Sequence, residues 1–160
     1  MDLFNKTSIL FVCLGNICRS PAAEGILKQK AAQKGLENNV FVDSAGIGAW
    51  HTGQLPDMRM RRCGEKNGYD FSSKARQIKR KDFERFDYII VMDDDNYRDV
   101  KMIAPTSGAM NKVHYIREYF NKYKSQQSVP DPYYGKEEDF QFAVDLLEDA
   151  CEGIIQQLLI

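Results

Sequence analysis

The stretch Thr7-Ser8-Ile9-Leu10-Phe11-Val12-Cys13-Leu14-Gly15-Asn16-Ile17-Cys18-Arg19-Ser20-Pro21 contains the pattern of a strand, a turn and the beginning of a helix. The run that ends at Cys13 is apolar and rich in β-branched and aromatic side chains, which is typical of a buried strand. Gly15 lets the chain curl, and Pro21 suits the first turn of a helix because its missing N–H costs nothing there. A helical pattern continues to Lys34, and Gly35 stops it.

The rest of the chain continues to alternate between strand and helix patterns. Three further strands are expected, at Val40–Val42, Tyr88–Met92 and, more weakly, Val113–Tyr115, with Gly46–Gly48 breaking the chain into a loop after the second strand. Helical patterns cover Asp57–Asn67, Asp94–Ile103 and Glu137–Leu159, and the proline-containing segment Gln126–Gly135 is expected to be a loop. This alternation predicts an α/β fold with a parallel sheet and helices on both faces. In such folds ligands bind at the carboxyl ends of the strands, where the turn after Cys13 lies.

Length and composition indicate one ordinary globular domain over residues 1–160. With 22 basic and 23 acidic residues the formal net charge is −1, which gives no footprint for nucleic acid. We expect no membrane insertion because every apolar run is too short to cross a bilayer. Met1–Gly15 does not resemble a signal peptide. Its apolar stretch, Ile9–Leu14, is too short, and it lacks a charged start before it and a small-residue cleavage site after it. A cytoplasmic location is therefore expected, and the oligomeric state stays open.

Cysteine usage fits that compartment. Four cysteines in 160 residues are too few for a disulfide scaffold, and in the cytosol they are expected to be thiols: Cys13, Cys18, Cys63 and Cys151. No cysteine or histidine pair has zinc-finger spacing, so neither a metal site nor a cofactor is expected.

The turn after the first strand carries the groups needed for phosphoryl chemistry. Its backbone N–H groups can converge on an anion, and the helix N-terminus behind them adds positive potential. The same potential favours the thiolate form of Cys13 at the base of the turn. Arg19 offers a planar set of donors for two oxygens of a phosphoryl group, and Ser20 can hydrogen-bond the sulfur. A nucleophile beneath a preformed phosphate site predicts covalent phosphoryl transfer without a metal.

The string Val12-Cys13-Leu14-Gly15-Asn16-Ile17-Cys18-Arg19-Ser20-Pro21 resembles the signature of the low-molecular-weight protein tyrosine phosphatases. A second resemblance is the late Asp131-Pro132-Tyr133-Tyr134-Gly135 segment before the last helix. Both motifs occur in the family's order, and the likeness covers essentially the full chain. It implies a three-layer α/β sandwich with a four-stranded, mainly parallel sheet and helices on both faces.

The resemblance also implies a role for each matching residue. Cys13 corresponds to the nucleophile that forms a phosphocysteine, Arg19 to the residue that stabilises the transition state, and Asp131 to the general acid. The phosphate-binding loop would be Leu14, Gly15, Asn16, Ile17, Cys18, Arg19 and Ser20. Asn16 and Ser44 resemble the pair that braces this loop by hydrogen bonds, and Trp50, Tyr133 and Tyr134 resemble the walls that hold the substrate ring. The implied substrates are phosphotyrosine-containing proteins and small aryl phosphates.

Several of these residues also have simpler interpretations. Cys18 is either a packing residue or, as the resemblance implies, the partner that traps oxidised Cys13 in a disulfide. Asp131 alone would be a turn residue, because Asp-Pro is a common turn dipeptide. Asp93–Asp95 looks like a metal site, but helix N-capping is the favoured explanation. The basic stretch Lys74–Arg85 is expected to be a solvated face, and His51 and His114 are expected to be structural.

Three other functions compete with this interpretation. Arsenate reductases share the first loop but need further cysteines in a mid-chain segment, and residues 74–111 contain none. A protein arginine phosphatase is expected to have a smaller polar residue where this chain has Ile17, and a less aromatic late loop. A phosphotyrosine-binding module without turnover would need neither Cys13 nor Asp131. The sequence therefore favours a metal-independent phosphotyrosine phosphatase.

Overall fold

The computed structural model describes residues 6–160, so the part of the signal-peptide expectation that concerns residues 1–5 lies outside the described chain. A four-stranded sheet has the order β2-β1-β3-β4, and its strand pairs are parallel. The strands are β1 (Thr7–Cys13), β2 (Val40–Gly46), β3 (Tyr88–Val91) and β4 (Val113–Tyr115). The α-helices are α1 (Arg19–Gln33), α2 (Met58–Lys66), α3 (Asp82–Arg85), α4 (Asp94–Ile103) and α5 (Glu137–Ile154). Short 3-10 turns at Gly108–Lys112 and Ile116–Tyr119 flank β4, and a π turn at Ile155–Leu159 extends α5.

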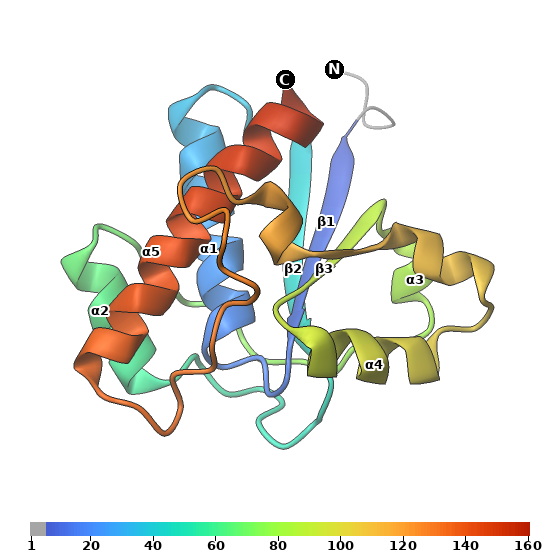
Figure 1. The fold of residues 1–160 in the computed structure, drawn as a ribbon, viewed down its shortest axis with the longest axis horizontal. Helices are drawn as coiled ribbons and strands as arrows, with labels where there is room; N and C mark the ends of the chain where they lie inside the picture. Colours follow the sequence, from blue (N-terminus) through green and yellow to red (C-terminus); the bar gives the residue numbers. More distant parts are fainter. Residues whose placement is uncertain (1–5) are drawn as a thin grey trace.

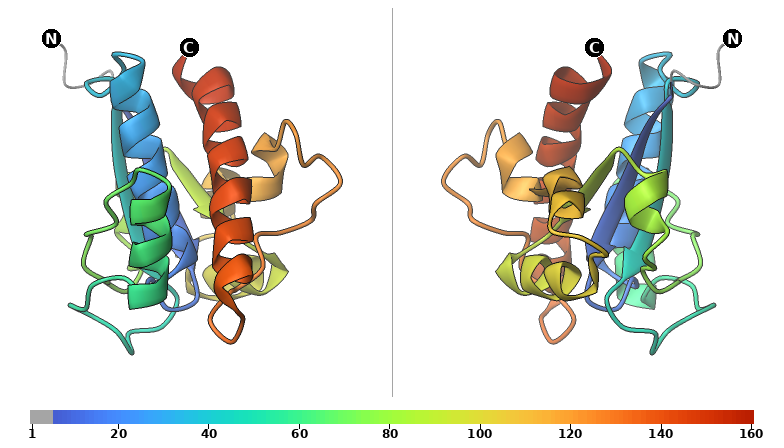
Figure 2. Two further views of the ribbon diagram at one scale, coloured as in Figure 1. Left: turned by 90° about the vertical axis from the view of Figure 1, so that its left-hand side faces the viewer. Right: turned by 90° about the vertical axis from the view of Figure 1, so that its right-hand side faces the viewer.

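The sheet separates two apolar cores because successive side chains of a strand point to opposite faces. Ile9 and Phe11 of β1 join the core shared with α1 and α5, whereas Leu10 and Val12 join the core beside α3 and α4. All four side chains are fully buried. The result is three layers, with α1 and α5 on one face of the sheet and α3 and α4 on the other (Figures 1 and 2). This confirms the predicted fold class.

Helix α2 packs mainly against α5, so it lies outside the helix pair that covers the sheet. Its apolar contacts come from Met60 and Cys63, which are buried, while its other face carries arginines exposed to solvent. Asp57 begins the helix as predicted, because its carboxylate accepts a hydrogen bond from the backbone N–H of Arg59.

The second strand is longer than predicted: β2 continues past Val42 to Gly46, and Gly46 is its last residue. The polar residues Asp43 and Ser44 lie beyond the predicted strand, yet β2 stays in parallel register with β1 until Cys13 faces Gly46. Their side chains find polar partners, Arg76 for Asp43 and Glu24 for Ser44, which offsets the cost of placing them in a sheet. Hydrogen bonds to residues outside the strand therefore allow β2 to continue beyond its apolar residues.

The basic stretch Lys74–Arg85 is a solvated face at most of its basic side chains, as expected, but Arg76 is half-buried and the stretch also makes structural contacts. Gln77 forms a β-bridge with Gly46, and the Ile78 N–H donates to the Gly46 carbonyl. The Arg76 guanidinium makes ion pairs at 3.0 Å with Asp43 of β2 and with Asp82 of α3. This segment therefore lies along the end of β2, next to the loop that follows β1.

Candidate active site

The loop predicted to bind phosphate follows the central strand β1 at the carboxyl edge of the sheet, where the loops after β2 and before α5 also lie (Figure 1). Cys13 ends β1 and is 3% exposed, and its Sγ lies 3.0 Å from Ser20 Oγ in the first turn of α1. Because α1 begins at Arg19, two residues earlier than the pattern starting at Pro21 suggested, the helix N-terminus lies directly behind the loop. The loop thus brings the sulfur of Cys13 close to the positive end of a helix, which favours its thiolate form.

Asn16 holds the loop in shape from within. Its φ of 57° lies in the left-handed region, which asparagine tolerates better than most residues. Its side-chain N–H donates to Ser20 Oγ at 2.7 Å, and its side-chain carbonyl accepts the backbone N–H of Arg76 at 3.0 Å. Asn16 therefore connects the Cys13–Ser20 contact to the segment along β2.

Ser44 does not take the bracing position expected for it. Its hydroxyl donates to Glu24 Oε1 at 2.6 Å, so it links β2 to helix α1 behind the loop. Glu24 is itself buried, and a buried carboxylate requires such donors. Ser44 therefore supports α1 rather than Asn16.

Arg19 is 2% exposed and is held mainly by Asp93. Its Nη1 donates to Asp93 Oδ2 at 2.6 Å and to the Val129 carbonyl at 3.0 Å, while Nη2 lies 3.7 Å from Asp131 Oδ2. Burial disfavours the charged guanidinium, but the Coulombic attraction of the Cys13 sulfur, the hydrogen bond to Asp93 and the charges of Asp93 and Asp131 outweigh burial, so the pKa of Arg19 is raised. Both close bonds use Nη1, which leaves Nε and Nη2 to bind two oxygens of a phosphoryl group.

Asp93 was missed as a site residue, although helix capping at this position is confirmed. Its Oδ1 accepts the Asn96 N–H at 2.8 Å at the start of α4, and its Oδ2 holds Arg19. One carboxylate thus begins a helix and orients the buried guanidinium. Its position directly after β3, at the carboxyl edge of the sheet, was the signal that pointed to a site role.

A pocket of about 210 Å³ is lined by Cys13 and Arg19 and by most of the other predicted site residues, but not by Asn16, Ser20 or Ser44. Asp131 lies on its wall, where its Oδ1 accepts the backbone N–H of Tyr133 at 3.1 Å. Trp50, Tyr133 and Tyr134 also line the pocket, and Trp50 and Tyr134 are 68% and 97% exposed. Large exposed aromatic side chains beside a polar floor suit a flat aryl group.

The two histidines differ in position. His51 lines the pocket beside Trp50 and bonds Gln54, so its treatment as a purely structural residue overlooked its place in the loop after β2. His114 lies on β4, 3.7 Å from Glu118, and is not part of this pocket.

Cys18 lies in the same pocket as Cys13 and is buried. Burial raises the pKa of its thiol far above the ordinary value, and Asp57 and Cys13 add to the rise. Cys18 therefore lies beside Cys13 in surroundings that disfavour its thiolate form.

Two further observations concern groups outside the pocket. Within residues 6–160, no three His, Cys, Asp or Glu side chains gather in a way that would hold a metal ion. None of the helices in the described chain has the length and apolar character needed to cross a membrane.

The comparisons with known proteins agree with this geometry. Residues 8–159 match the family described as low molecular weight phosphotyrosine protein phosphatase. A Synechocystis protein assigned to the low molecular weight protein-tyrosine-phosphatases is 45% identical over 150 residues, which are 94% of this chain and 95% of the relative. The Bacillus subtilis low molecular weight protein-tyrosine-phosphatase YfkJ is 40% identical over 154 residues, with 94% and 95% coverage. The crystal structure of a protein tyrosine phosphatase from Entamoeba histolytica superposes with a TM-score of 0.92 at 42% identity, over 96% of this chain and 97% of that one. The chain belongs to the family of low molecular weight protein-tyrosine phosphatases.

Proposed function

We propose that Cys13, Arg19 and Asp131 carry out the phosphotyrosine hydrolysis that this enzyme family performs. The observation that carries the assignment is their convergence: Cys13 Sγ lies at the base of a pocket that also holds the buried Arg19 guanidinium and the Asp131 carboxyl group. Residues 1–160 form one catalytic domain in this proposal, supported by the family match over residues 8–159.

The reaction has two steps that share the same groups. Cys13 Sγ attacks phosphorus in line, an S–P bond forms, and the P–O bond to the tyrosine breaks. Arg19 and the loop N–H groups hold the equatorial oxygens, and protonated Asp131 gives its proton to the leaving phenolate. Water then attacks phosphorus, Asp131 takes a proton from it, and the sulfur leaves. The Ser20 hydroxyl, 3.0 Å from Sγ, stabilises the departing thiolate.

The substrate is a phosphotyrosine side chain of a protein, and small aryl phosphates are also accepted. Exposed Trp50 and Tyr134 support this choice, because the pocket widens into aromatic side chains at the surface. We also place the reaction in the cytoplasm, where the four cysteines remain free thiols.

The direct test is phosphate release from phosphotyrosine and phosphoarginine peptides in parallel, with a chelator present. Turnover of phosphotyrosine, unaffected by the chelator, is expected. Preference for phosphoarginine would contradict the aryl specificity and leave the cysteine chemistry standing.

The Cys13→Ser variant tests the nucleophile. We expect turnover to be abolished because a serine hydroxyl in this site is a much weaker nucleophile than a thiolate. Binding of inorganic phosphate, measured by calorimetry, is expected to persist because the loop and Arg19 are unchanged. Residual turnover near the wild-type rate would remove Cys13 from its proposed role.

We further propose that Cys18 protects Cys13 from irreversible oxidation. When peroxide converts the Cys13 thiolate to a sulfenic acid, the Cys18 thiol attacks it, a disulfide forms and water leaves. The common pocket of the two residues supports this step. Dithiothreitol should then restore activity to peroxide-treated wild type and much less to a Cys18→Ser variant; equal recovery would contradict the proposal.

A further inference from the structure

The segment 130–135, which we call the Asp131 loop, has few polar contacts with the rest of the protein. Within residues 6–160, every hydrogen bond of this loop stays inside it, and one of them joins the Tyr133 N–H to the Asp131 carboxylate at 3.1 Å. In the same part of the chain its only ion pair is with Arg19, whose Nη2 lies 3.7 Å from a half-exposed carboxylate. A pair with this separation and exposure restrains a loop weakly, so the place of Asp131 depends on packing as well.

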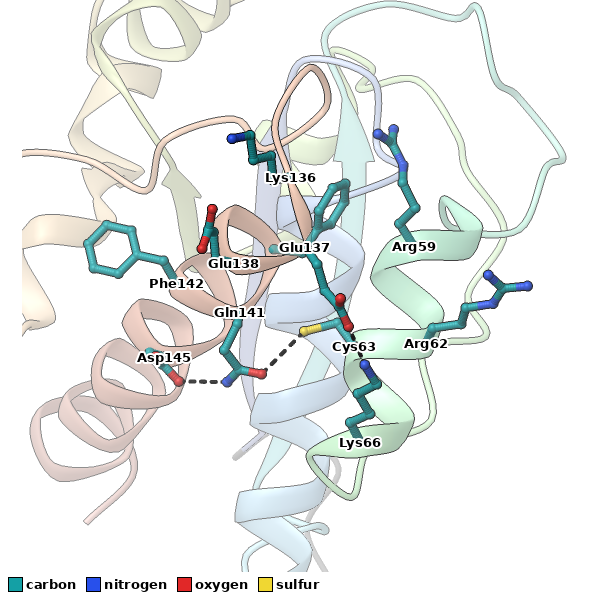
Figure 3. A pocket seen from close by; sticks show the side chains of 11 residues that line it. Arg59, Arg62, Cys63, Lys66, Lys136, Glu137, Glu138, Gln141, Phe142 and Asp145 are labelled. Atoms are coloured by element: carbon teal, nitrogen blue, oxygen red, sulfur yellow. Dashed lines mark hydrogen bonds and ion pairs between the residues drawn. The ribbon is translucent and has the colours of Figure 1, made fainter.

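Arg59 of α2 supplies a packing contact to the Asp131 loop. Its guanidinium carbon lies over the Tyr133 ring, 5.3 Å from the ring centre, and 4.7 Å from the centre of the Phe140 ring in α5. Such contacts between a guanidinium and an aromatic face are attractive. Figure 3 shows Arg59 extending from the first turn of α2, at the opposite end of the helix from Lys66. Arg59 therefore lies between the Asp131 loop and the buried Phe140 side chain.

Asp57 fixes the orientation of Arg59 and ties it to the loop after β1. Arg59 Nε donates to Asp57 Oδ1 at 3.0 Å and Nη2 donates to Oδ2 at 2.9 Å, and two parallel hydrogen bonds set the plane of a guanidinium. The backbone N–H of Asp57 donates to the carbonyl of Ile17, in the predicted phosphate-binding loop, at 2.8 Å. A continuous series of contacts therefore runs from the phosphate-binding loop through Asp57 and Arg59 to the Asp131 loop.

We propose that Arg59 is a positioning residue, which sets the place of Asp131 relative to the phosphoryl group through Tyr133. Asp131 and Tyr133 line the active-site pocket and Arg59 does not, so its effect on the reaction must pass through the loop. A general acid must lie within hydrogen-bond reach of the leaving oxygen, so a small displacement of Asp131 slows substrates whose leaving group needs a proton. This inference rests on the proposed function and adds the residue that fixes the general acid.

The Arg59→Ala variant should impair proton donation and leave phosphate binding intact. We expect kcat/KM for phenyl phosphate to fall about tenfold, because displacing a catalytic group by about 1 Å costs up to about 10²-fold. For p-nitrophenyl phosphate the fall should stay within about twofold, because its phenolate leaves without a proton. The inhibition constant of inorganic phosphate should be unchanged. Arg59→Lys keeps a cation over the ring but loses the paired hydrogen bonds, so its effect should be smaller.

Arg62→Ala is the matched control for the loss of one positive charge from α2. Arg62 is exposed and points away from α5 (Figure 3). We expect this variant to keep the wild-type kcat/KM for both aryl phosphates. A loss equal to that of Arg59→Ala would show that the effect does not pass through Tyr133, and the inference would be overturned.

A double-mutant cycle shows whether Arg59 acts through Asp131. In the Asp131→Asn variant the proton donor is already gone, so adding Arg59→Ala should change kcat/KM for phenyl phosphate by less than about twofold. A further loss of about tenfold would place the effect of Arg59 elsewhere and overturn the inference. So would equal rates of wild type and Arg59→Ala, or equal slowing of both aryl phosphates by that variant. If Arg59→Ala does not fold, Arg59→Lys takes its place in the cycle.

The Asp131→Asn variant on its own separates this inference from the proposed function. If it slows phenyl phosphate far more than p-nitrophenyl phosphate and Arg59→Ala does not, the inference about Arg59 alone is overturned. If Asp131→Asn slows both substrates equally, the general-acid assignment is wrong, and the positioning role of Arg59 with it. Absence of turnover of both aryl phosphates by the wild type would overturn the phosphatase assignment itself.

Discussion

Arg19 shows how one buried side chain depends on a partner far away in the sequence. A guanidinium that is 2% exposed loses most of its hydration, and the loss is offset because Asp93, 74 residues away, lies 2.6 Å from Nη1. The carboxylate also fixes which nitrogens face the pocket. In the proposed mechanism, Arg19 is thus oriented for phosphate before any substrate arrives.

Replacing Asp93 separates its two tasks. Asp93→Asn should keep the N-cap of α4, because asparagine caps helices as well as aspartate, but it removes the charge that orients Arg19. We expect kcat/KM for an aryl phosphate to fall at least tenfold while thermal stability changes less than in Asp93→Ala. The alanine variant should lose about 1 kcal/mol more through the missing cap. Steady-state kinetics and thermal unfolding check this, and full activity of the asparagine variant would contradict the orienting role.

The role proposed for Asp131 predicts a dependence on the leaving group. Its side chain is 41% exposed and reaches the pocket from a loop, so removing it should leave the phosphate-binding loop intact. Asp131→Asn should slow phenyl phosphate by about 10²–10⁴-fold, and p-nitrophenyl phosphate much less, because its phenolate leaves without a proton. Rates measured across a series of substituted phenyl phosphates test this. An equal slowing for good and poor leaving groups would argue against general-acid catalysis.

At the scale of elements, the end of β2 and the segment beside it hold the phosphate-binding loop. Gly46 donates its N–H to the Arg76 carbonyl and accepts from Ile78, while Arg76 donates to Asn16. The ion pairs of Arg76 with Asp43 and Asp82 tie this segment to β2 and α3. The geometry of Cys13 thus depends on contacts with a part of the chain about 60 residues later.

The close approach of Gly46 to the loop predicts the effect of one methyl group. A Cβ at this position would lie 2.9 Å from the Gly15 carbonyl carbon and 3.0 Å from the Asn16 nitrogen, both backbone atoms. Gly46→Ala should therefore displace the loop and reduce kcat by at least tenfold, because a displacement of about 1 Å in a catalytic group costs about 10²-fold. Gly108→Ala serves as control, since its Cβ would meet just the Thr106 Oγ1 at 3.8 Å. Similar kinetics of the two variants would contradict the argument.

At the scale of the whole molecule, α1 and α5 pack side by side over one face of the sheet (Figure 2). Lys30 and Lys34 of α1 reach Glu152 of α5 at 2.9 and 3.2 Å. The hydrogen bond from Lys30 is the main reason why the pKa of Glu152 is lowered, with Lys34 contributing. These ion pairs therefore hold α1, which follows the Cys13 loop, against α5.

The lowered pKa predicts a dependence of stability on pH. A glutamate whose folded pKa is depressed stabilises the fold above its unfolded pKa of about 4.3, and this contribution is lost as the pH falls through the lower folded value. Glu152→Gln should therefore flatten the fall in unfolding free energy below about pH 5. Urea unfolding at several pH values measures it, with Glu138→Gln as an exposed control. If the unfolding free energy of Glu152→Gln depends on pH in parallel with that of the wild type, the ion pairs of Glu152 do not contribute to the pH dependence of stability.

Much of the fold and part of the site were predictable from local sequence. The apolar run of β1, the helical pattern of α5 and the start of a helix at Asp57 depend on neighbouring residues, so they were anticipated correctly. The short helix α3 and the end of β2 were not, because their residues lack strong apolar patterns and are held by Arg76. His51 was missed at the site because nothing beside it in the chain indicates a pocket. Asp93 was missed because helix capping already explained it, although it directly follows β3 at the carboxyl edge of the sheet.

The sequence by itself determined the strand–turn–helix unit and the order of groups from Cys13 to Ser20, because a nucleophile, a glycine-bearing turn and a helix start act over adjacent residues. The tertiary structure decided which distant groups complete it. Asp93, Val129 and Asp131 reach Arg19 across 74 to more than 100 residues, and Arg76 reaches Asn16 across 60. Such contacts depend on the order of strands in the sheet and on the burial of charge, and these are properties of the packed molecule rather than of any stretch of chain.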